Sequence, residues 1–341
     1  MVLYGRLGHL CVDPRPAVRK SACQTLFCTI SSHGSVLSTA ELHCWKELVW
    51  NVLFPLLEQV RHNTNTASRE RDKVANHPAF MMHHSRDTAE KQWAETSVHA
   101  LAGVTRVFNS KSAVLMKLAA DEFHRMWLFL LGVVETLALS HNAEIALSAL
   151  KGFHELLGNQ NYFSSAASFA GASNSAAQTV AAAAAAASIV SQPTSPQSGT
   201  TTTTNTATSL VVKTFDIQQW LAAWKCWLEI GNRLVSVGGG GSLETCTPPS
   251  QTFLTCYVDL VCVILERLAP AGKFTGSDFE SLSHIVDKLL SVPVLNNDYY
   301  SLTHMQADKT DANLNPLQSS SLNIVRHFIK VSAFFDMKTL R

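Results

Sequence analysis

Apolar residues recur at helical spacing along most of this chain. The first complete pattern begins at Asp13, an N-cap residue, with Pro14 and Pro16 in the first turn that follows it. Four apolar positions then lie on one helical face: Val18, Ala22, Leu26 and Ile30. Gly34 stands where a left-handed C-cap is expected, so the pattern predicts a helix over about Pro14–Ser32.

The same spacing predicts further helices before residue 160. A wide apolar stripe covers Leu42–Val60 and contains Pro55, which we expect to kink the helix without ending it. A polar loop over His62–Met82 is expected next, and Ser85 is the expected cap of a helix that reaches Phe108. Two more helices are predicted, over Val114–Leu139 and Asn142–Leu157, the second ending at Gly158. No alternating strand pattern flanked by turns occurs in this half.

The composition changes sharply between residues 161 and 212. Runs such as Ala181–Ala187 and Thr200–Thr204 carry almost no charge and few large apolar residues. Such a segment does not bury enough apolar area to offset the roughly 1–2 kcal/mol per residue of backbone ordering. We therefore predict a disordered low-complexity insert.

Helical patterns resume after the insert. They predict helices over Phe215–Val235, Phe253–Leu268 and Phe279–Leu290, with a flexible connector at Gly238–Gly241. A polar segment, Asn296–Ser320, precedes a last amphipathic helix at Leu322–Phe335, whose packing partner we expect outside the chain. The predicted domains are helical repeats over 1–160, the insert at 161–212, further repeats over 213–295 and a terminal part at 296–341.

The fold class predicted by these patterns is all-α. The spacing Asp13-x-Arg15-x-x-Val18-Arg19-x-x-Ala22 is typical of the second helix of a HEAT repeat, in which aspartate and arginine pair between stacked repeats. Successive helices of antiparallel length then favour a HEAT/armadillo-like α-solenoid of antiparallel helix pairs. The opening pattern of Leu3, Leu7 and Leu10 has no polar lead-in, so we expect the chain to begin inside a longer array.

Composition and charge narrow the classes of function. The chain has 341 residues, 46% of them hydrophobic and 16% charged, which excludes global disorder. A net charge of +1 provides no overall basic field for nucleic acid or an anionic bilayer. The longest apolar run, Met126–Leu139, is shorter than the roughly 20 residues of a membrane span. Because Arg6 and Asp13 interrupt any secretory signal, we expect a cytosolic chain with reduced, buried cysteines.

Candidate chemistry is sparse in this sequence. No two cysteines have the short spacing of a zinc site, and Gly238–Gly241 lacks the lysine of a phosphate-binding loop. The run His83-His84-Ser85-Arg86-Asp87 has no identifiable third catalytic member, so a structural or partner-facing role is favoured. We predict no catalytic residue, metal or cofactor.

Two clusters remain with a structural and a functional interpretation. Trp220, Trp224 and Trp227 recur at helical spacing, which indicates core more often than an exposed partner groove. Arg15, Arg19 and Lys20 form a small basic group near a helix start. A solvated face or an inter-repeat ion pair is the simpler interpretation of this group, and contact with an anionic lipid or acidic partner is the alternative.

Three segments closely resemble the monensin-sensitivity (Mon-two) proteins: LYGRLGHLCVDPRPAVRKSACQTLFCTISSHG, WKELVWNVLFPLLEQV and HHSRDTAEKQWAETSVHALAGVTRVFN. The similarity is dense over Leu3–Leu157 and looser over Phe215–Leu290. These proteins are relatives of the large Arf guanine-exchange factors, and they lack the catalytic exchange domain. The chain resembles an internal to C-terminal portion of such a protein.

The resemblance implies a non-enzymatic cytoplasmic scaffold, peripherally attached to trans-Golgi and endosomal membranes, in endosome-to-Golgi and Golgi-to-vacuole or lysosome transport. It implies Dopey-type proteins, an Arf-like GTPase and a lipid flippase as partners. The most characteristic segments supply the candidate partner-binding residues, which are Arg15, Arg19, His83, His84, Arg86, Gln92 and Trp93. Two alternatives stay open: a regulator of nucleotide exchange on an Arf-family GTPase, and a solenoid nuclear-transport adaptor.

Overall fold

The computed structural model describes residues 1–40, 42–75, 88–158, 215–237, 250–291 and 316–332. These residues form helices and contain no strand, which confirms the all-α prediction. The elements are α1 (Val2–Leu10), α2 (Pro16–Ala40), α3 (Leu42–Leu48), the π-helical turn η1 (Val49–Leu53), α4 (Phe54–Ala75), α5 (Ala89–Ser110), α6 (Ser112–Leu115), α7 (Ala120–Ala138), α8 (Ala143–Leu156), α11 (Ile217–Val237), α12 (Gln251–Leu268), α13 (Gly276–Leu290) and α14 (Pro316–Ser332).

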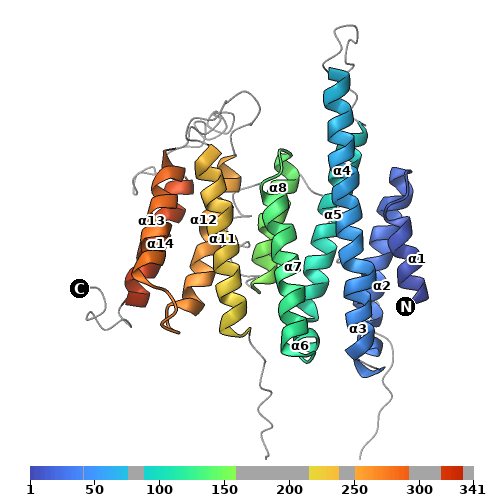
Figure 1. Ribbon diagram of the computed structural model, residues 1–341, viewed down its shortest axis with the longest axis horizontal. Coiled ribbons are helices and arrows are strands. Elements are labelled where there is room, and N and C mark those ends of the chain that lie inside the picture. Colours follow the sequence, from blue (N-terminus) through green and yellow to red (C-terminus); the bar gives the residue numbers. More distant parts are fainter. Residues whose placement is uncertain (41, 76–87, 159–214, 238–249, 292–315, 333–341) are drawn as a thin grey trace, which may run out of the picture. The chain divides into compact units, whose positions relative to one another are not determined.

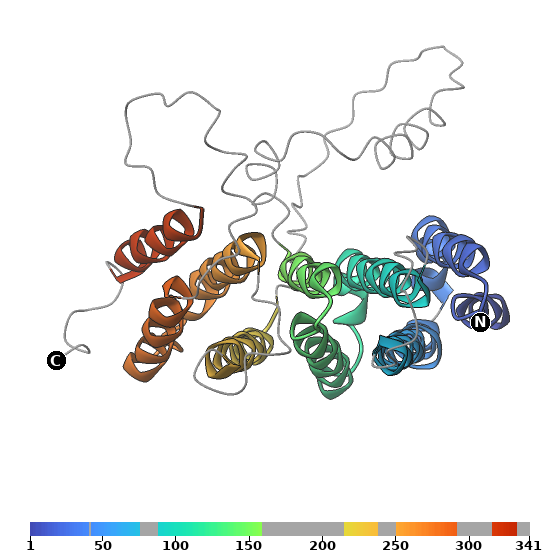
Figure 2. The same cartoon turned by 90° about the horizontal axis from the view of Figure 1, so that it is seen from above.

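The helices pack in two rows, which are seen end-on in Figure 2. In one row α2, α5, α8, α12 and α14 each contact the next. In the other row lie α1, α4, α7, α11 and α13, and each of these packs on its counterpart in the first row. The apolar stripes of paired helices therefore face one another, and the core lies between the rows. Figure 1 labels the helices in a view in which the two rows overlap.

Helices on either side of residues 159–214 are in direct contact. The indole Nε1 of Trp127, on α7, donates to the carbonyl oxygen of Gln219, on α11, at 3.0 Å. The Trp127 ring also lies 4.8 Å from that of Phe215, measured between centroids, and α8 packs on α12. The two helical stretches thus share one core. The low-complexity segment and Gly238–Gly241 lie outside the described residues.

The tryptophans of α11 lie in the core, which confirms the structural interpretation of that cluster. Trp227 stacks on Trp224 and on Tyr257, with ring centroids 5.2 and 4.6 Å apart. Trp227 Nε1 donates to the Tyr257 carbonyl oxygen, and the Tyr257 hydroxyl donates to the Trp227 carbonyl oxygen at 2.7 Å. This reciprocal pair joins α11 to α12.

Two predicted helix boundaries in the first 75 residues are wrong. Gly34 does not cap α2, which continues to Ala40, and Gly34 is buried where the Trp45 and Lys111 side chains come close. The predicted polar loop is helical as far as Ala75, because Thr64 and Ala67 are buried on the side of α4 that packs on α5. The helix predicted over Leu42–Val60 is interrupted by the π-helical turn η1, and α4 begins at Phe54 and continues through Pro55.

Two later helices also differ from the prediction. Helix α5 begins at Ala89 with Thr88 as its cap, and Ser85 lies outside the described residues. The single helix predicted over Val114–Leu139 is divided into α6 and α7, because Leu115 is buried where α6 packs on α3 and α5. The boundaries of α8 agree with the prediction, with Asn142 capping its start and Gly158 at φ +79° after its end.

The last helix has its partners within the chain, contrary to our expectation. Helix α14 starts at Pro316, inside the segment predicted as polar, and packs on α12 and α13. Leu317 and Ile324 are buried, and the Ser320 hydroxyl donates to the Asp259 carboxylate on α12. The apolar pattern placed the start of this helix too late, at Leu322, because its first turns contain several serines, one of which bonds to α12.

Substituting Gly231 by alanine is expected to lower the free energy of unfolding by about 1–3 kcal/mol. An added β-carbon on Gly231 would stand 2.2 Å from the Tyr257 hydroxyl oxygen and 2.9 Å from Ile285 Cδ1. The matched control is Gly132→Ala on α7, where an added β-carbon would have nothing within 4 Å. Alanine at this position is expected to raise the free energy of unfolding by about 0.5–1 kcal/mol. Urea unfolding of both variants measures the difference, and equal effects would contradict the packing described.

Candidate functional site

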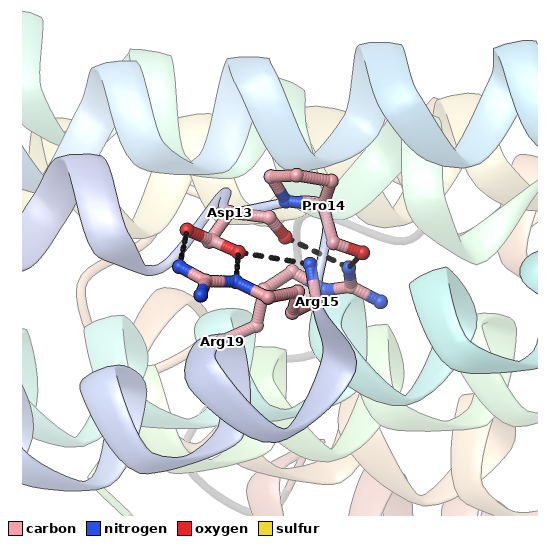
Figure 3. A network of polar contacts seen from close by, with 4 residues as sticks. All are labelled: Asp13, Pro14, Arg15 and Arg19. Atoms are coloured by element: carbon pink, nitrogen blue, oxygen red, sulfur yellow. Dashed lines mark hydrogen bonds and ion pairs between the residues drawn. The ribbon is translucent and has the colours of Figure 1, made fainter.

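The candidate site lies where the chain enters α2, and it begins with an ion pair. The Asp13 carboxylate accepts hydrogen bonds from the backbone N–H, Nε and Nη2 of Arg15, each at 2.9 Å (Figure 3). These bonds lower the pKa of Asp13 to about 2. The Arg15 side chain is 71% exposed, so this pair lies at the surface.

Arg19, one turn further on, is 1% exposed. Its Nη1 donates to the carbonyl oxygens of Asp13 and Pro14, both at 2.9 Å (Figure 3), and its Nε donates to Thr96 Oγ1 at 3.0 Å. The guanidinium carbon also lies 3.9 Å from the centroid of the Trp93 ring. Arg19 therefore ties the loop before α2 to α5, the next helix in the row.

The charge of Arg19 is only partly compensated. Among the described residues no carboxylate lies within ion-pair distance of its guanidinium, and Nη2 has no hydrogen-bond partner there. Burial lowers the pKa of Arg19, while the Asp13 carboxylate, engaged by Arg15, raises it from a distance. A buried cation without a counter-ion is energetically unfavourable. Its positive charge also favours the ionised form of nearby acidic groups.

A cavity of about 120 Å³ adjoins Arg19 between α2 and α5. Its lining residues are Pro16, Ala17, Arg19, Lys20, Cys23, Gln92, Glu95, Thr96 and His99. Drug-sized ligands occupy roughly 300–1,000 Å³, so this cavity is large enough only for a small molecule or a single side-chain group.

The structure brings part of the predicted site together. Arg19, Gln92 and Trp93 meet at the junction of α2 and α5, with Arg15 at the surface beside them. The predicted residues His83, His84 and Arg86 lie outside the described residues. The prediction of a solvated face or an inter-repeat ion pair is wrong for Arg19, which is buried and donates to the carbonyl oxygens of Asp13 and Pro14 and to Thr96 Oγ1. Arg15 does lie at the surface, where it pairs with Asp13 of its own segment.

Sequence reasoning missed a second polar cluster between α3 and α7. The Glu122 carboxylate, nearly buried, accepts from Trp50 Nε1 at 2.7 Å and from Lys46 Nζ at 3.0 Å, with Arg125 at 3.9 Å. A cavity of about 300 Å³ opens beside it, lined by His43, Lys46, Glu47, Trp50, Asn51, Glu122 and Arg125. The one sequence signal was Pro55, because the π-helical turn before this proline contains Trp50.

Replacing Glu122 by glutamine is expected to cost about 1–2 kcal/mol at pH 7, because the bonds from Lys46 and Trp50 lose a charged acceptor. The hydrogen bond from Lys46 is the largest influence on the pKa of Glu122 and lowers it. Burial opposes this effect, and the hydrogen bond from Trp50 lowers the pKa further. A lowered carboxyl pKa stabilises the fold above the unfolded-state value of about 4.3 and stops doing so as the pH falls through the folded-state value.

The difference between wild type and Glu122→Gln should therefore shrink below about pH 4. Denaturant unfolding between pH 3 and 7 measures it. Glu47→Gln is the control, since Glu47 pairs with His43 at 3.8 Å on the surface and should change stability by less than about 0.5 kcal/mol. A pH-independent difference for Glu122→Gln would show that the carboxylate charge is not involved.

Five cysteines are buried as predicted, namely Cys11, Cys23, Cys226, Cys256 and Cys262. Cys28 is exposed and Cys44 is half-buried, which corrects the expectation for those two. The part of the chain that the structure describes holds no group of three or more His, Cys, Asp or Glu side chains placed to bind a metal ion. Within the same residues, no helix has the length and apolar character needed to cross a membrane.

Comparison with known proteins places the chain beside longer relatives. The profile of a family described as the C-terminal region of Mon2 protein matches residues 1–338. The chain is 34% identical over 336 residues to a protein MON2 homolog of Drosophila melanogaster, covering 95% of this chain and 17% of the relative. It is 34% identical over 299 residues to the Homo sapiens homolog, covering 86% of this chain and 17% of that protein.

A shorter match links the chain to another class of protein. Over 68 residues, 20% of this chain and 4% of the relative, it is 38% identical to brefeldin A-inhibited guanine nucleotide-exchange protein 2 of Arabidopsis thaliana. No solved structure matches the chain.

Proposed function

The chain belongs to the Mon2 family, and from this premise we propose that it is a non-enzymatic segment of a scaffold for vesicle transport between endosomes and the trans-Golgi network. The observation that carries the proposal is the family match over residues 1–338. The chain spans about 17% of the length of the Drosophila and human relatives. A role of the whole protein is therefore part of this proposal.

The architecture proposed for this scaffold is a HEAT/armadillo-like α-solenoid. Pairing of α1 with α2, α4 with α5, α7 with α8, α11 with α12 and α13 with α14 supports it, since each pair covers the apolar face of the next. The proposed organisation is helical repeats over 1–160 and 213–295, separated by the insert at 161–212 and followed by a terminal part at 296–341. A stacked array presents long surfaces to other proteins, which suits a scaffold.

The proposed partners are those of the family: a Dopey-type protein, an Arf-like GTPase and a lipid flippase, met at the cytoplasmic face of trans-Golgi and endosomal membranes. The proposed contact surface includes Arg15, which is exposed, and the neighbouring Gln92 at the rim of the α2–α5 cavity. Arg19 and Trp93 would support that surface from beneath, because Arg19 is buried under it.

Localisation of the tagged full chain tests this function. We expect overlap with a trans-Golgi marker, and we expect Arg15→Ala to weaken the overlap because it removes an exposed cation without disturbing the core. Arg233→Ala is the control, since Arg233 is also an exposed, ion-paired cation, with Glu229 on α11 and Glu135 on α7 as its partners. A diffuse signal from the folded wild-type chain would contradict recruitment by this segment, and equal effects of both variants would contradict the assignment of Arg15.

A second candidate function is regulation of nucleotide exchange on an Arf-family GTPase. The match of 68 residues to a brefeldin A-inhibited exchange protein favours it. Release of a fluorescent nucleotide from a loaded Arf-family GTPase, measured with and without the chain and with a known exchange factor as positive control, decides between the two. Release that is unchanged by the chain would exclude direct regulation by this segment.

A further inference from the structure

A buried cation borders the cavity between α2 and α5. Arg19 is 1% exposed and lines this cavity, and its Nη2 has no hydrogen-bond partner within the part of the chain that the structure describes. Its three hydrogen bonds go to uncharged oxygens, which belong to the carbonyl groups of Asp13 and Pro14 and to the Thr96 hydroxyl. None of the ion pairs between described residues includes its guanidinium. Arg19 therefore brings to the cavity a positive charge without a contacting counter-ion.

The start of α2 favours an anion at the same place. Pro16 and Ala17, the first two residues of α2, line the cavity. The N-terminal end of a helix carries a partial positive charge that stabilises anions close to it, and α2 is a long helix of 25 residues. The helix end and the buried guanidinium thus act on one small volume with the same sign.

The other charged residues of the lining set how much negative charge the cavity takes. Lys20 and His99 add two exposed basic side chains, and Glu95, also exposed, adds a carboxylate. With His99 neutral, the cations of Arg19 and Lys20 and the one carboxylate of Glu95 leave a single positive charge. A singly charged anion balances this lining, whereas a dianion would meet repulsion from Glu95.

The size and position of the cavity favour a side chain of a protein over a membrane. Its volume of about 120 Å³ corresponds to about four water molecules at the roughly 30 Å³ that each occupies in the liquid, which is comparable to an aspartate or glutamate side chain. An anionic bilayer attracts exposed basic residues. Arg19, by contrast, is buried between two helices, where only a group that enters the cavity comes close to it.

We propose that the α2–α5 cavity receives a single carboxylate, the aspartate or glutamate side chain of an acidic segment in a partner protein. The carboxylate supplies the negative charge that Arg19 lacks, and Lys20 attracts neighbouring acidic residues of the same segment. This inference rests on the proposed scaffold function, because it names the chemistry of a partner that the surface around Arg15 and Gln92 would bind.

The experiment measures binding of a rhodamine-labelled oligoglutamate peptide to the folded full chain by fluorescence anisotropy at low ionic strength. An oligoglutamine peptide of the same length is the uncharged control. We expect the glutamate peptide to bind and the glutamine peptide not to bind. Added salt should weaken the binding, because it screens the attraction between exposed charges.

Ala17→Leu tests the cavity itself. Ala17 is exposed at the start of α2, so a leucine there occupies space at the cavity without removing a core contact. We expect this variant to weaken binding of the glutamate peptide at least about tenfold, because the larger side chain excludes the carboxylate. Thr25→Leu is the matched control, since Thr25 is exposed on the same helix and is not among the lining residues. It should leave the binding unchanged.

Two charge variants should have opposite effects on the same binding. Lys20→Gln removes a cation and should weaken the binding about two- to fivefold, the range for exposed charge pairs. Glu95→Gln removes the competing carboxylate and should strengthen the binding by a similar factor. Both residues are exposed, so these variants should fold, which thermal unfolding followed by circular dichroism checks.

Three results would overturn the proposal. A wild-type chain that binds neither peptide, or binds both equally, would show that the cavity takes no carboxylate. Equal effects of Ala17→Leu and Thr25→Leu would show that the peptide binds elsewhere. Co-flotation with phosphatidylserine vesicles that is lost in Ala17→Leu, without peptide binding, would identify an anionic membrane as the ligand. Because peptide binding is measured outside the cell, its failure is distinguishable from a diffuse localisation, which would contradict the trafficking function.

Discussion

Replacing Trp227 by alanine is expected to lower the free energy of unfolding by about 3–5 kcal/mol, the range for truncating a buried aromatic residue. Trp227 is fully buried and lies between the rings of Trp224 and Tyr257, with both interplanar angles at 8°. The substitution leaves a cavity, removes two stacking contacts and leaves the Tyr257 carbonyl oxygen without its indole donor. Because typical domains have only 5–15 kcal/mol of stability, much of the total would be lost.

Guanidinium or urea unfolding measures this effect, with two variants as references. Lys225→Ala changes an exposed residue of the same helix and should alter stability by less than about 0.5 kcal/mol. Trp227→Phe keeps a ring in the stack, removes the indole donor and leaves a smaller cavity than alanine does, so its effect should fall between the two. If Trp227→Ala destabilised no more than Lys225→Ala, the packing of α11 on α12 described above would be wrong.

Replacing Arg19 by alanine is expected to cost about 3 kcal/mol. The side chain makes three hydrogen bonds from a charged group, to the carbonyl oxygens of Asp13 and Pro14 and to Thr96 Oγ1. Alanine leaves the part-buried carbonyl oxygens and the buried Thr96 hydroxyl without this donor, and it opens a cavity beside Trp93. The substitution also removes the free-energy cost of burying a cation, which offsets part of the loss. The expected cost is therefore below the sum for three hydrogen bonds from a charged group.

Arg15→Ala is the matched control for Arg19→Ala, because the two arginines lie four residues apart in one segment. The exposed pair between Arg15 and Asp13 should contribute much less to stability than the buried Arg19 network, and less still at high salt. Arg19→Lys provides a further test, since a lysine provides one nitrogen and does not reach all three acceptors. Equal costs for Arg15→Ala and Arg19→Ala would contradict the buried network.

Local sequence signals were sufficient where a helix boundary depends on the residues at that boundary. Asn142 caps α8 by accepting from the N–H groups of Glu144 and Ile145, and Gly158 ends it at a positive φ, as the sequence predicted. The spacing of Trp220, Trp224 and Trp227 likewise predicted their burial. In these cases neighbouring residues contain the whole signal.

Local signals failed where a distant helix decides the outcome. Gly34 has the residue type of a C-cap, yet it is helical because Trp45 and Lys111 lie against it. Thr64 is polar and was assigned to a loop, but it is buried on α4, and its hydroxyl contacts the Trp93 carbonyl oxygen on α5 at 3.4 Å. Glycine and threonine have low helix propensity, but they adopt the helical conformation where packing against another helix stabilises it.

The candidate site shows the same division. The sequence by itself determined the helical class, the identity of the residues at the start of α2 and the resemblance to the family, since each depends on residue types and spacing. Only the tertiary structure decided that Arg19 is buried against Trp93 and that its partners are two carbonyl oxygens and Thr96. Burial and pairing depend on which faces of separate helices come together, and a one-dimensional pattern specifies the face of a helix but not its neighbour.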